Sequence, residues 1–69
     1  MQVLDVVAVT EDLPQHGLCR GHVGTIVEEL GDGVVEVEFS DQQGRPYALA
    51  ALPTRLLMKL LYTRSTEAA

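Results

Sequence analysis

The hydrophobic residues of this chain fall into short runs separated by polar turns, which is the pattern of a protein built from β-strands. The clearest run consists of three apolar residues that alternate with three polar ones: Val35, Glu36, Val37, Glu38, Phe39 and Ser40. Alternation with a period of two places the apolar side chains on one face of a strand and the polar ones on the other. We therefore expect a half-buried strand here, with Phe39 in the core.

Three other runs also predict strands, because they are rich in β-branched and apolar residues. They cover residues 3–10, 22–30 and 45–51. In the last of them, Tyr47 and Leu49 share one face with Ala51 by the same alternation.

Glycine and polar residues mark the connections between these runs. Residues 31–33 (Gly-Asp-Gly) predict a hairpin turn, because glycine and aspartate tolerate a positive φ. Residues 41–44 predict a second turn, and residues 11–17 predict a longer loop. Gly24, inside the second run, indicates a bend or a close backbone approach of the kind that lets a small barrel close.

The last apolar segment, residues 52–62, fits two structures. As a helix it would carry leucines on one side, opposite Arg55 and Lys59. As a strand it would be apolar on both faces apart from Lys59. Its Leu-Pro-Thr-Arg start favours a short 3₁₀ turn followed by a strand over residues 56–62, because a fifth strand would close a barrel.

Together these elements predict an all-β fold, a small five-stranded SH3-like barrel with a short 3₁₀ turn before the last strand. The 69 residues suffice for one domain, which we place at residues 1–64, followed by a frayed tail at residues 65–69. A chain this short buries only about 60% of its unfolded surface, so we expect it to need further support. The single Cys19 cannot form an internal disulfide, which leaves a metal or oligomerisation.

The sequence also predicts the compartment. The first residues carry no basic start, and no apolar run approaches the ~18 residues of a membrane-spanning helix. A lone cysteine is typical of a reducing environment. We therefore expect a soluble, cytoplasmic protein with no membrane attachment.

The net charge of −5 is unevenly distributed along the chain. Residues 1–41 contain nine acidic residues and one basic residue (1 − 9 = −8), whereas residues 42–69 contain four basic residues and one acidic residue (4 − 1 = +3). Binding to DNA or RNA needs clustered Lys and Arg to neutralise phosphates, so this balance argues against nucleic acid as the main partner. It permits a basic protein partner.

The order of these segments is similar to that of a known family. The matching segments are Asp5-Val6-Val7, Glu11-Asp12-Leu13-Pro14, Gly17-Leu18, Gly21-His22-Val23-Gly24-Thr25-Ile26-Val27-Glu28, Gly31-Asp32-Gly33, Glu36-Val37-Glu38-Phe39, Asp41, Gly44 and Leu52-Pro53. The first of them resemble the opening of SH3-like barrels of the KOW type. In combination, over residues 3–60, they resemble a small bacterial family known as domain of unknown function 4926. The resemblance implies the SH3-like fold and brings no function with it.

One loop contains residues that can bind metals. His16, Cys19 and His22 follow one another at three-residue steps and could meet on a zinc ion at a bend. Structural zinc takes four ligands, and the fourth would have to come from a distant acidic residue, while Arg20 among the ligands disfavours a cation. The alternative is a polar loop with a partly buried Cys19, and we assign no metal or cofactor to this chain.

Three acidic residues, Glu28, Glu36 and Glu38, are candidates for contact with a partner. Alternation places Glu36 and Glu38 on the polar face of a strand, whereas a pair of catalytic carboxylates would need a cleft. The two remaining interpretations are a solvated face that keeps the protein soluble and a surface that binds a basic protein.

The last segment supplies a second candidate surface at Leu57, Leu60 and Leu61. One face of this strand would be buried in the barrel, and the other would need cover, because large exposed apolar patches are uncommon on monomers. Association with a second copy through this edge is the simplest expectation, and a different protein partner is the second.

These observations lead to three hypotheses about function. The first is a non-enzymatic protein-interaction module that acts through the acidic face, the apolar last strand or both. The second is a small acidic antitoxin or immunity-type protein that neutralises a basic partner. The third is a weak binder of metal, or of nucleic acid through the four basic residues of the second half: Arg45, Arg55, Lys59 and Arg64.

Overall fold

The computed structural model describes residues 1–62, and these residues form an all-β fold. The five strands are β1 (Val6–Val9), β2 (Val23–Gly31), β3 (Val34–Ser40), β4 (Pro46–Pro53) and β5 (Leu57–Lys59). Two 3₁₀ turns, η1 (Pro14–His16) and η2 (Thr54–Leu56), lie in the first loop and directly before β5. The predicted all-β class and the 3₁₀ turn before the last strand are confirmed.

The last apolar segment is therefore a turn and a strand, and the helical alternative is wrong. The strand is shorter than the expected 56–62, because η2 occupies the chain up to Leu56 and β5 ends at Lys59. The predicted tail at residues 65–69, and the predicted domain end at residue 64, lie outside the described residues. No helix in residues 1–62 is long and apolar enough to cross a membrane.

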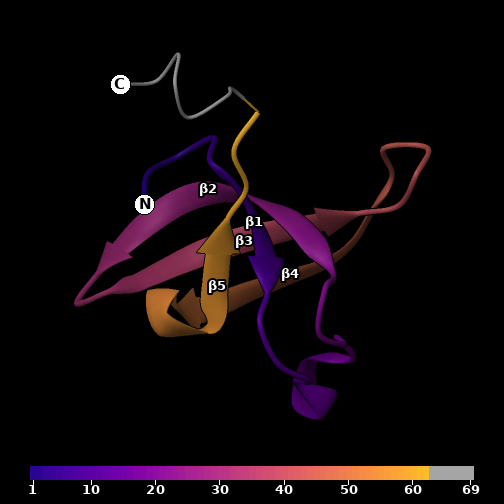
Figure 1. Cartoon of the computed structure of the whole chain (residues 1–69), viewed down its shortest axis with the longest axis horizontal. Helices are drawn as coiled ribbons and strands as arrows, with labels where there is room; N and C mark the ends of the chain where they lie inside the picture. The colour runs from indigo at the N-terminus through magenta and orange to yellow at the C-terminus, as the bar shows by residue number, and fades with distance from the viewer. Residues whose placement is uncertain (63–69) are drawn as a thin grey trace.

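The strands form one antiparallel sheet in the order β4-β3-β2-β1-β5. In Figure 1, β1 and β5 run crosswise to β3 and β4, so the sheet is coiled around its own inner face. Within the described residues β4 and β5 are the two edges, and no backbone ladder joins them. The sheet thus wraps a core, and its closure into a barrel stays a prediction.

The core is formed by apolar side chains from all five strands and from the first loop. Its buried members are Val7, Val9, Leu13, Leu18, Ile26, Val35, Val37, Phe39, Ala50, Leu52 and Leu57. On β3 the burial alternates residue by residue, as expected, and Phe39 is fully buried. The inward row of β4 is Ala48, Ala50 and Leu52, so Leu49 and Ala51 point outward. Tyr47 lies at an irregularity of the β3–β4 register, and its ring centroid is 6.4 Å from that of Phe39.

The bend of β2 depends on Gly24. This residue pairs with Val7 on one side and with Phe39 on the other. A Cβ at Gly24 would lie 2.7 Å from Val37 Cγ1, 2.8 Å from Glu38 O and 2.9 Å from Phe39 Cδ1. Real Cβ atoms do not approach other atoms this closely, so glycine is required for the strands to pack here.

The second half of β2 is irregular. Val27 and Leu30 are extra residues opposite β3, because the register shifts between Ile26 and Glu28 and again between Glu29 and Gly31. Such bulges bend a strand and increase its twist. The hairpin closes as predicted over residues 31–33, and all three have a positive φ.

Candidate interaction surfaces

The outer face of β2 and β3 brings two carboxylates together. Glu28 on β2 lies directly opposite Glu36 on β3. Glu38 occurs two residues after Glu36 and therefore lies on the same face, opposite Thr25. Like charges directly opposite in a sheet destabilise it, typically by about 0.2–1 kcal/mol. The face thus has a concentrated negative charge at an energetic cost.

No cation of the described residues neutralises this acidic face. The two ion pairs within residues 1–62 are Arg45 with Asp41 and Lys59 with Asp5. Neither involves Glu28, Glu36 or Glu38.

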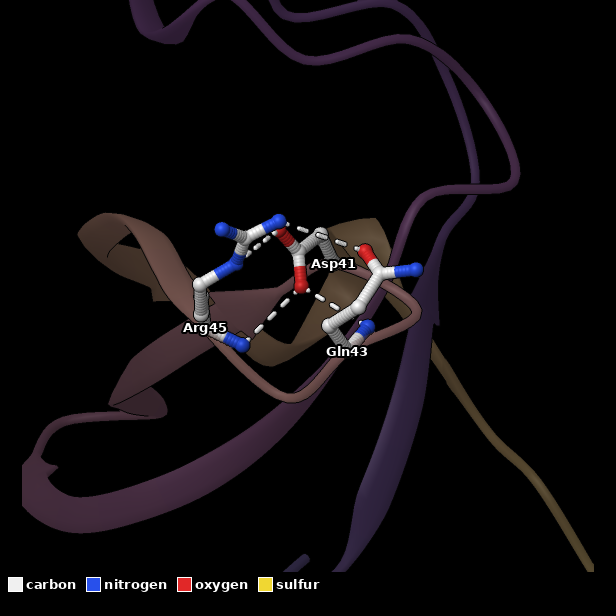
Figure 2. A network of polar contacts seen from close by, with 3 residues as sticks. All are labelled: Asp41, Gln43 and Arg45. Carbon is white, nitrogen blue, oxygen red and sulfur yellow. Dashed lines mark hydrogen bonds and ion pairs between the residues drawn. The ribbon is translucent and has the colours of Figure 1, made fainter.

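The Arg45–Asp41 pair belongs to the turn between β3 and β4, which Figure 2 shows from close by. One oxygen of Asp41, Oδ1, accepts hydrogen bonds from the backbone N–H groups of Gln43 (2.9 Å) and Arg45 (3.0 Å). The other, Oδ2, lies 3.3 Å from Arg45 Nε, and Arg45 Nη2 donates to Gln43 Oε1 at 3.5 Å. The Arg45 guanidinium is therefore engaged in its own turn.

Apolar side chains of β4 border the acidic face. Glu38 lies opposite Leu49, and Glu36 lies opposite Ala51. Leu49 is 60% exposed, and Ala51 is exposed as well. The outer surface of β2, β3 and β4 thus combines acidic residues in its middle with an apolar row at its edge. Alternation in the sequence predicts that Leu49 and Ala51 share a face, but it does not indicate that this face borders the acidic residues.

A second candidate surface is a groove of about 260 Å³ between the N-terminal residues and the segment after β5. It is lined by Leu4, Asp5, Val6, Lys59, Leu60, Leu61 and Tyr62. Three of its apolar side chains are largely exposed: Leu4 at 77%, Leu61 at 75% and Tyr62 at 80%. Leu4 also has a φ of 77°, which is costly for a branched residue.

The two charged groups of this groove are paired with each other. Asp5 Oδ1 lies 3.5 Å from Lys59 Nζ, and Asp5 Oδ2 accepts a 2.9 Å hydrogen bond from Gln2 N–H. The Gln2 hydrogen bond is the main reason that the pKa of Asp5 lies below its ordinary value, and the Lys59 charge acts in the same direction.

The three leucines expected to form a partner surface are separated by the structure. Leu57 belongs to the core and is only 6% exposed, so it is unavailable to a partner and the expectation for this residue is wrong. Leu60 is half-buried, and its N–H donates to Val6 O. Leu61 is the member of the set that is largely exposed.

The loop with His16, Cys19 and His22 is arranged by backbone contacts. His22 Nδ1 accepts a hydrogen bond from Cys19 N–H at 2.7 Å, and the His22 ring makes an edge contact with Tyr47. Cys19 is a free, exposed thiol. Within residues 1–62 no three His, Cys, Asp or Glu side chains are grouped so that they could hold a metal ion.

Two parts of these surfaces were not identified from the sequence. The pairing of Glu28 with Glu36 depends on the extra residue Val27, and the sequence does not reveal a bulge at that position. Leu4 was expected inside a strand, and no feature of the sequence indicated a turn with positive φ.

A comparison with family models matches residues 3–59 to the family described as domain of unknown function (DUF4926). The match spans most of the chain, and the chain belongs to this family. Neither the curated proteins nor the solved structures contain a significant match to it.

Proposed function

We propose that this member of domain of unknown function 4926 is a non-enzymatic protein-interaction module. It binds a basic surface of another protein through the acidic outer face of β2 and β3. The observation that carries the proposal is the cross-strand pair of Glu28 and Glu36, which forms no ion pair with any cation of residues 1–62.

A basic partner removes the repulsion within this pair. A Lys or Arg side chain placed between Glu28 and Glu36 can donate hydrogen bonds to both carboxylates, and charge-assisted hydrogen bonds are about twice as strong as neutral ones. The exposed Leu49 beside Glu38 provides apolar contact area next to the charges. Acidic residues flanked by apolar ones fit a partner segment in which basic and apolar residues are mixed.

Two further features support a non-enzymatic role in the cytoplasm. The charged groups of the groove, Asp5 and Lys59, are paired with each other, which leaves neither as a free acid or base. The free thiol of Cys19 is compatible with a reducing compartment.

The test is capture of partners from a lysate of the native cell, followed by mass spectrometry. The bait is the wild-type chain, compared with the double variant Glu28→Gln/Glu36→Gln. We expect the wild type to retain a basic protein that moderate salt releases, because contacts between exposed charges are screened. The double variant should lose that protein.

The matched control is Glu11→Gln/Asp32→Asn, which removes the same number of negative charges from the first loop and the hairpin tip. This control should retain the partner. If both double variants lose the partner equally, the attraction depends on net charge alone, which would contradict a specific face. If both retain the partner as the wild type does, the acidic face is not the binding surface.

The same complementarity would serve a protein that neutralises a basic toxin or nuclease. This second form of the proposal is favoured by the net charge of −5 on so short a chain. A captured partner whose own activity falls when this chain binds would support it, and a partner whose activity is unchanged would exclude it.

A further inference from the structure

The outer side of β4 is an open strand edge. Among residues 1–62, β4 pairs with β3 alone. Thr54 N–H donates to Gly33 O at 2.8 Å, and in an antiparallel ladder such a bond lies beside a non-hydrogen-bonded pair, here Val34 and Pro53. The next pair along the ladder, Val35 and Leu52, must then be a hydrogen-bonded pair, in which the N–H of each residue donates to the C=O of the other.

The alternation of hydrogen-bonded and non-hydrogen-bonded pairs sets the direction of the backbone N–H and C=O groups along β4. Ala50 and Leu52 direct their N–H and C=O groups toward β3. Leu49 and Ala51 direct theirs away from it, to the open edge. No hydrogen bond from the described residues satisfies these outward groups.

The open edge has prolines and an irregularity only at its ends, and its middle has none of the features that keep natural edge strands unpaired. Such strands are usually very short, bulged, or interrupted by charged residues or proline. Here Pro46 and Pro53 bound the strand, and the six residues 47–52 between them are uncharged. Their exposed side chains include Tyr47 and Leu49. This segment is therefore suited to pair with another strand.

We propose that β4 pairs antiparallel with β4 of a second copy, about a two-fold axis at Ala50. Leu49 then lies opposite Ala51 of the partner subunit, and Ala51 lies opposite Leu49 of the partner subunit. This register satisfies all the outward N–H and C=O groups of both residues in both copies. It also places a large side chain beside a small one on the outer face.

Other registers satisfy fewer groups. A shift of two residues in one direction sets Leu49 opposite Pro53, which has no N–H to donate. A shift in the other direction sets Ala51 opposite Tyr47, at the irregularity where the β3–β4 register skips a residue. The prolines and the bulge thus select the register centred on Ala50.

The negative charge of each copy does not oppose this pairing. The acidic residues Glu36 and Glu38 lie on β3, one strand in from the edge. In the dimer the two β3 strands are three strand spacings apart, about 14 Å. The Debye length at physiological salt is about 8 Å, so the two acidic rows are screened from each other. The proposal is independent of the acidic face binding a partner.

Amide hydrogen exchange of the full chain, followed by NMR in dilute and concentrated samples, tests the pairing directly. We expect the Leu49 and Ala51 amides to exchange at least about tenfold more slowly in the concentrated sample, because pairing closes the edge. The Ala50 and Leu52 amides are bonded to β3 and should be protected in both samples. Sedimentation should give twice the 7.5 kDa mass of the chain when concentrated.

A single-chain mass at millimolar concentration would overturn the proposal. A dimer whose Leu49 and Ala51 amides exchange as fast as in the dilute sample would also overturn it, since such a dimer uses another surface.

Variants supply a second line of evidence. Ala51→Pro removes an outward N–H without touching the β3 ladder, and Leu49→Lys places a charge on the edge. Each should raise the dimer dissociation constant by at least about tenfold, since the two-fold axis repeats each change in both copies. Circular dichroism checks that each variant folds.

The matched control is Leu61→Lys, which introduces the same charge at a leucine of the groove that is more exposed than Leu49. It should leave the dissociation constant unchanged. Weakening by Leu61→Lys, with none from Leu49→Lys, would move the interface to the segment after β5 and overturn the proposal.

Discussion

At the scale of single residues, Gly24 limits how closely the strands can pack. Both of its cross-strand partners, Val7 and Phe39, are fully buried, so Gly24 lies in the part of the sheet that covers the core. A methyl group there has no free volume, because one of the atoms it would meet is the backbone oxygen of Glu38. Backbone cannot move aside as a flexible side chain can.

Gly24→Ala should therefore lower the free energy of unfolding by about 1–3 kcal/mol, the range for overpacked sites. Urea denaturation measures the loss. Gly17→Ala is the matched control, because a methyl group at Gly17 meets no atom within 4 Å although its φ of 68° is also unfavourable. The control should lose about 1–2 kcal/mol from backbone strain alone. A Gly24→Ala variant as stable as the wild type would show that the strands can separate at this point.

At the scale of elements, the turn between β3 and β4 is organised by one carboxylate. Asp41 Oδ1 accepts two backbone N–H groups, while Asp41 Oδ2 pairs with an exposed guanidinium (Figure 2). The backbone bonds fix the chain path, whereas an exposed ion pair contributes about 0–1 kcal/mol. The hydrogen bonds should therefore matter more than the charge.

Two substitutions of Asp41 separate these contributions. Asp41→Asn keeps an oxygen that can accept the Gln43 and Arg45 N–H groups, so its stability should stay within about 0.5 kcal/mol of the wild type. Asp41→Ala loses both acceptors and should cost about 1–2 kcal/mol. Thermal unfolding at two salt concentrations measures both. Equal losses from the two variants would mean that the ion pair dominates.

The elements also show how far the sequence alone could lead. The alternation on β3 placed Phe39 in the core because a period of two leaves little choice of face. The apolar pattern of residues 56–62 predicts one strand, whereas η2 ends at Leu56 and β5 has only three residues, the first of which, Leu57, lies in the core. Strand length here is set by where the turn lets the chain meet β1, which no local pattern encodes.

The same limit applies to the candidate site. Composition and alternation indicated that Glu36 and Glu38 face outward, and the structure agrees. The placement of Glu28 opposite Glu36 could not be read from the sequence, because the extra residue Val27 changes the cross-strand register. A bulge depends on packing between strands and leaves no local signature in this segment.

At the scale of the whole molecule, stability and binding make opposing demands on the net charge of −5. The acidic face repels itself through Glu28, Glu36 and Glu38, and the cations of the two ion pairs lie elsewhere in the described structure. If this charge serves a partner, removing part of it should make the isolated protein more stable and the complex weaker.

Glu36→Gln should therefore raise the free energy of unfolding by about 0.2–1 kcal/mol at low salt. The gain should shrink as salt is added, because the wild type then loses its repulsion as well. Glu11→Gln, in the first loop with no carboxylate on a neighbouring strand, removes the same charge and should change stability far less. Urea denaturation across a salt series measures both variants. If Glu36→Gln and Glu11→Gln raise the free energy of unfolding equally, the effect comes from net charge. If Glu36→Gln does not raise it, water already screens the opposed carboxylates.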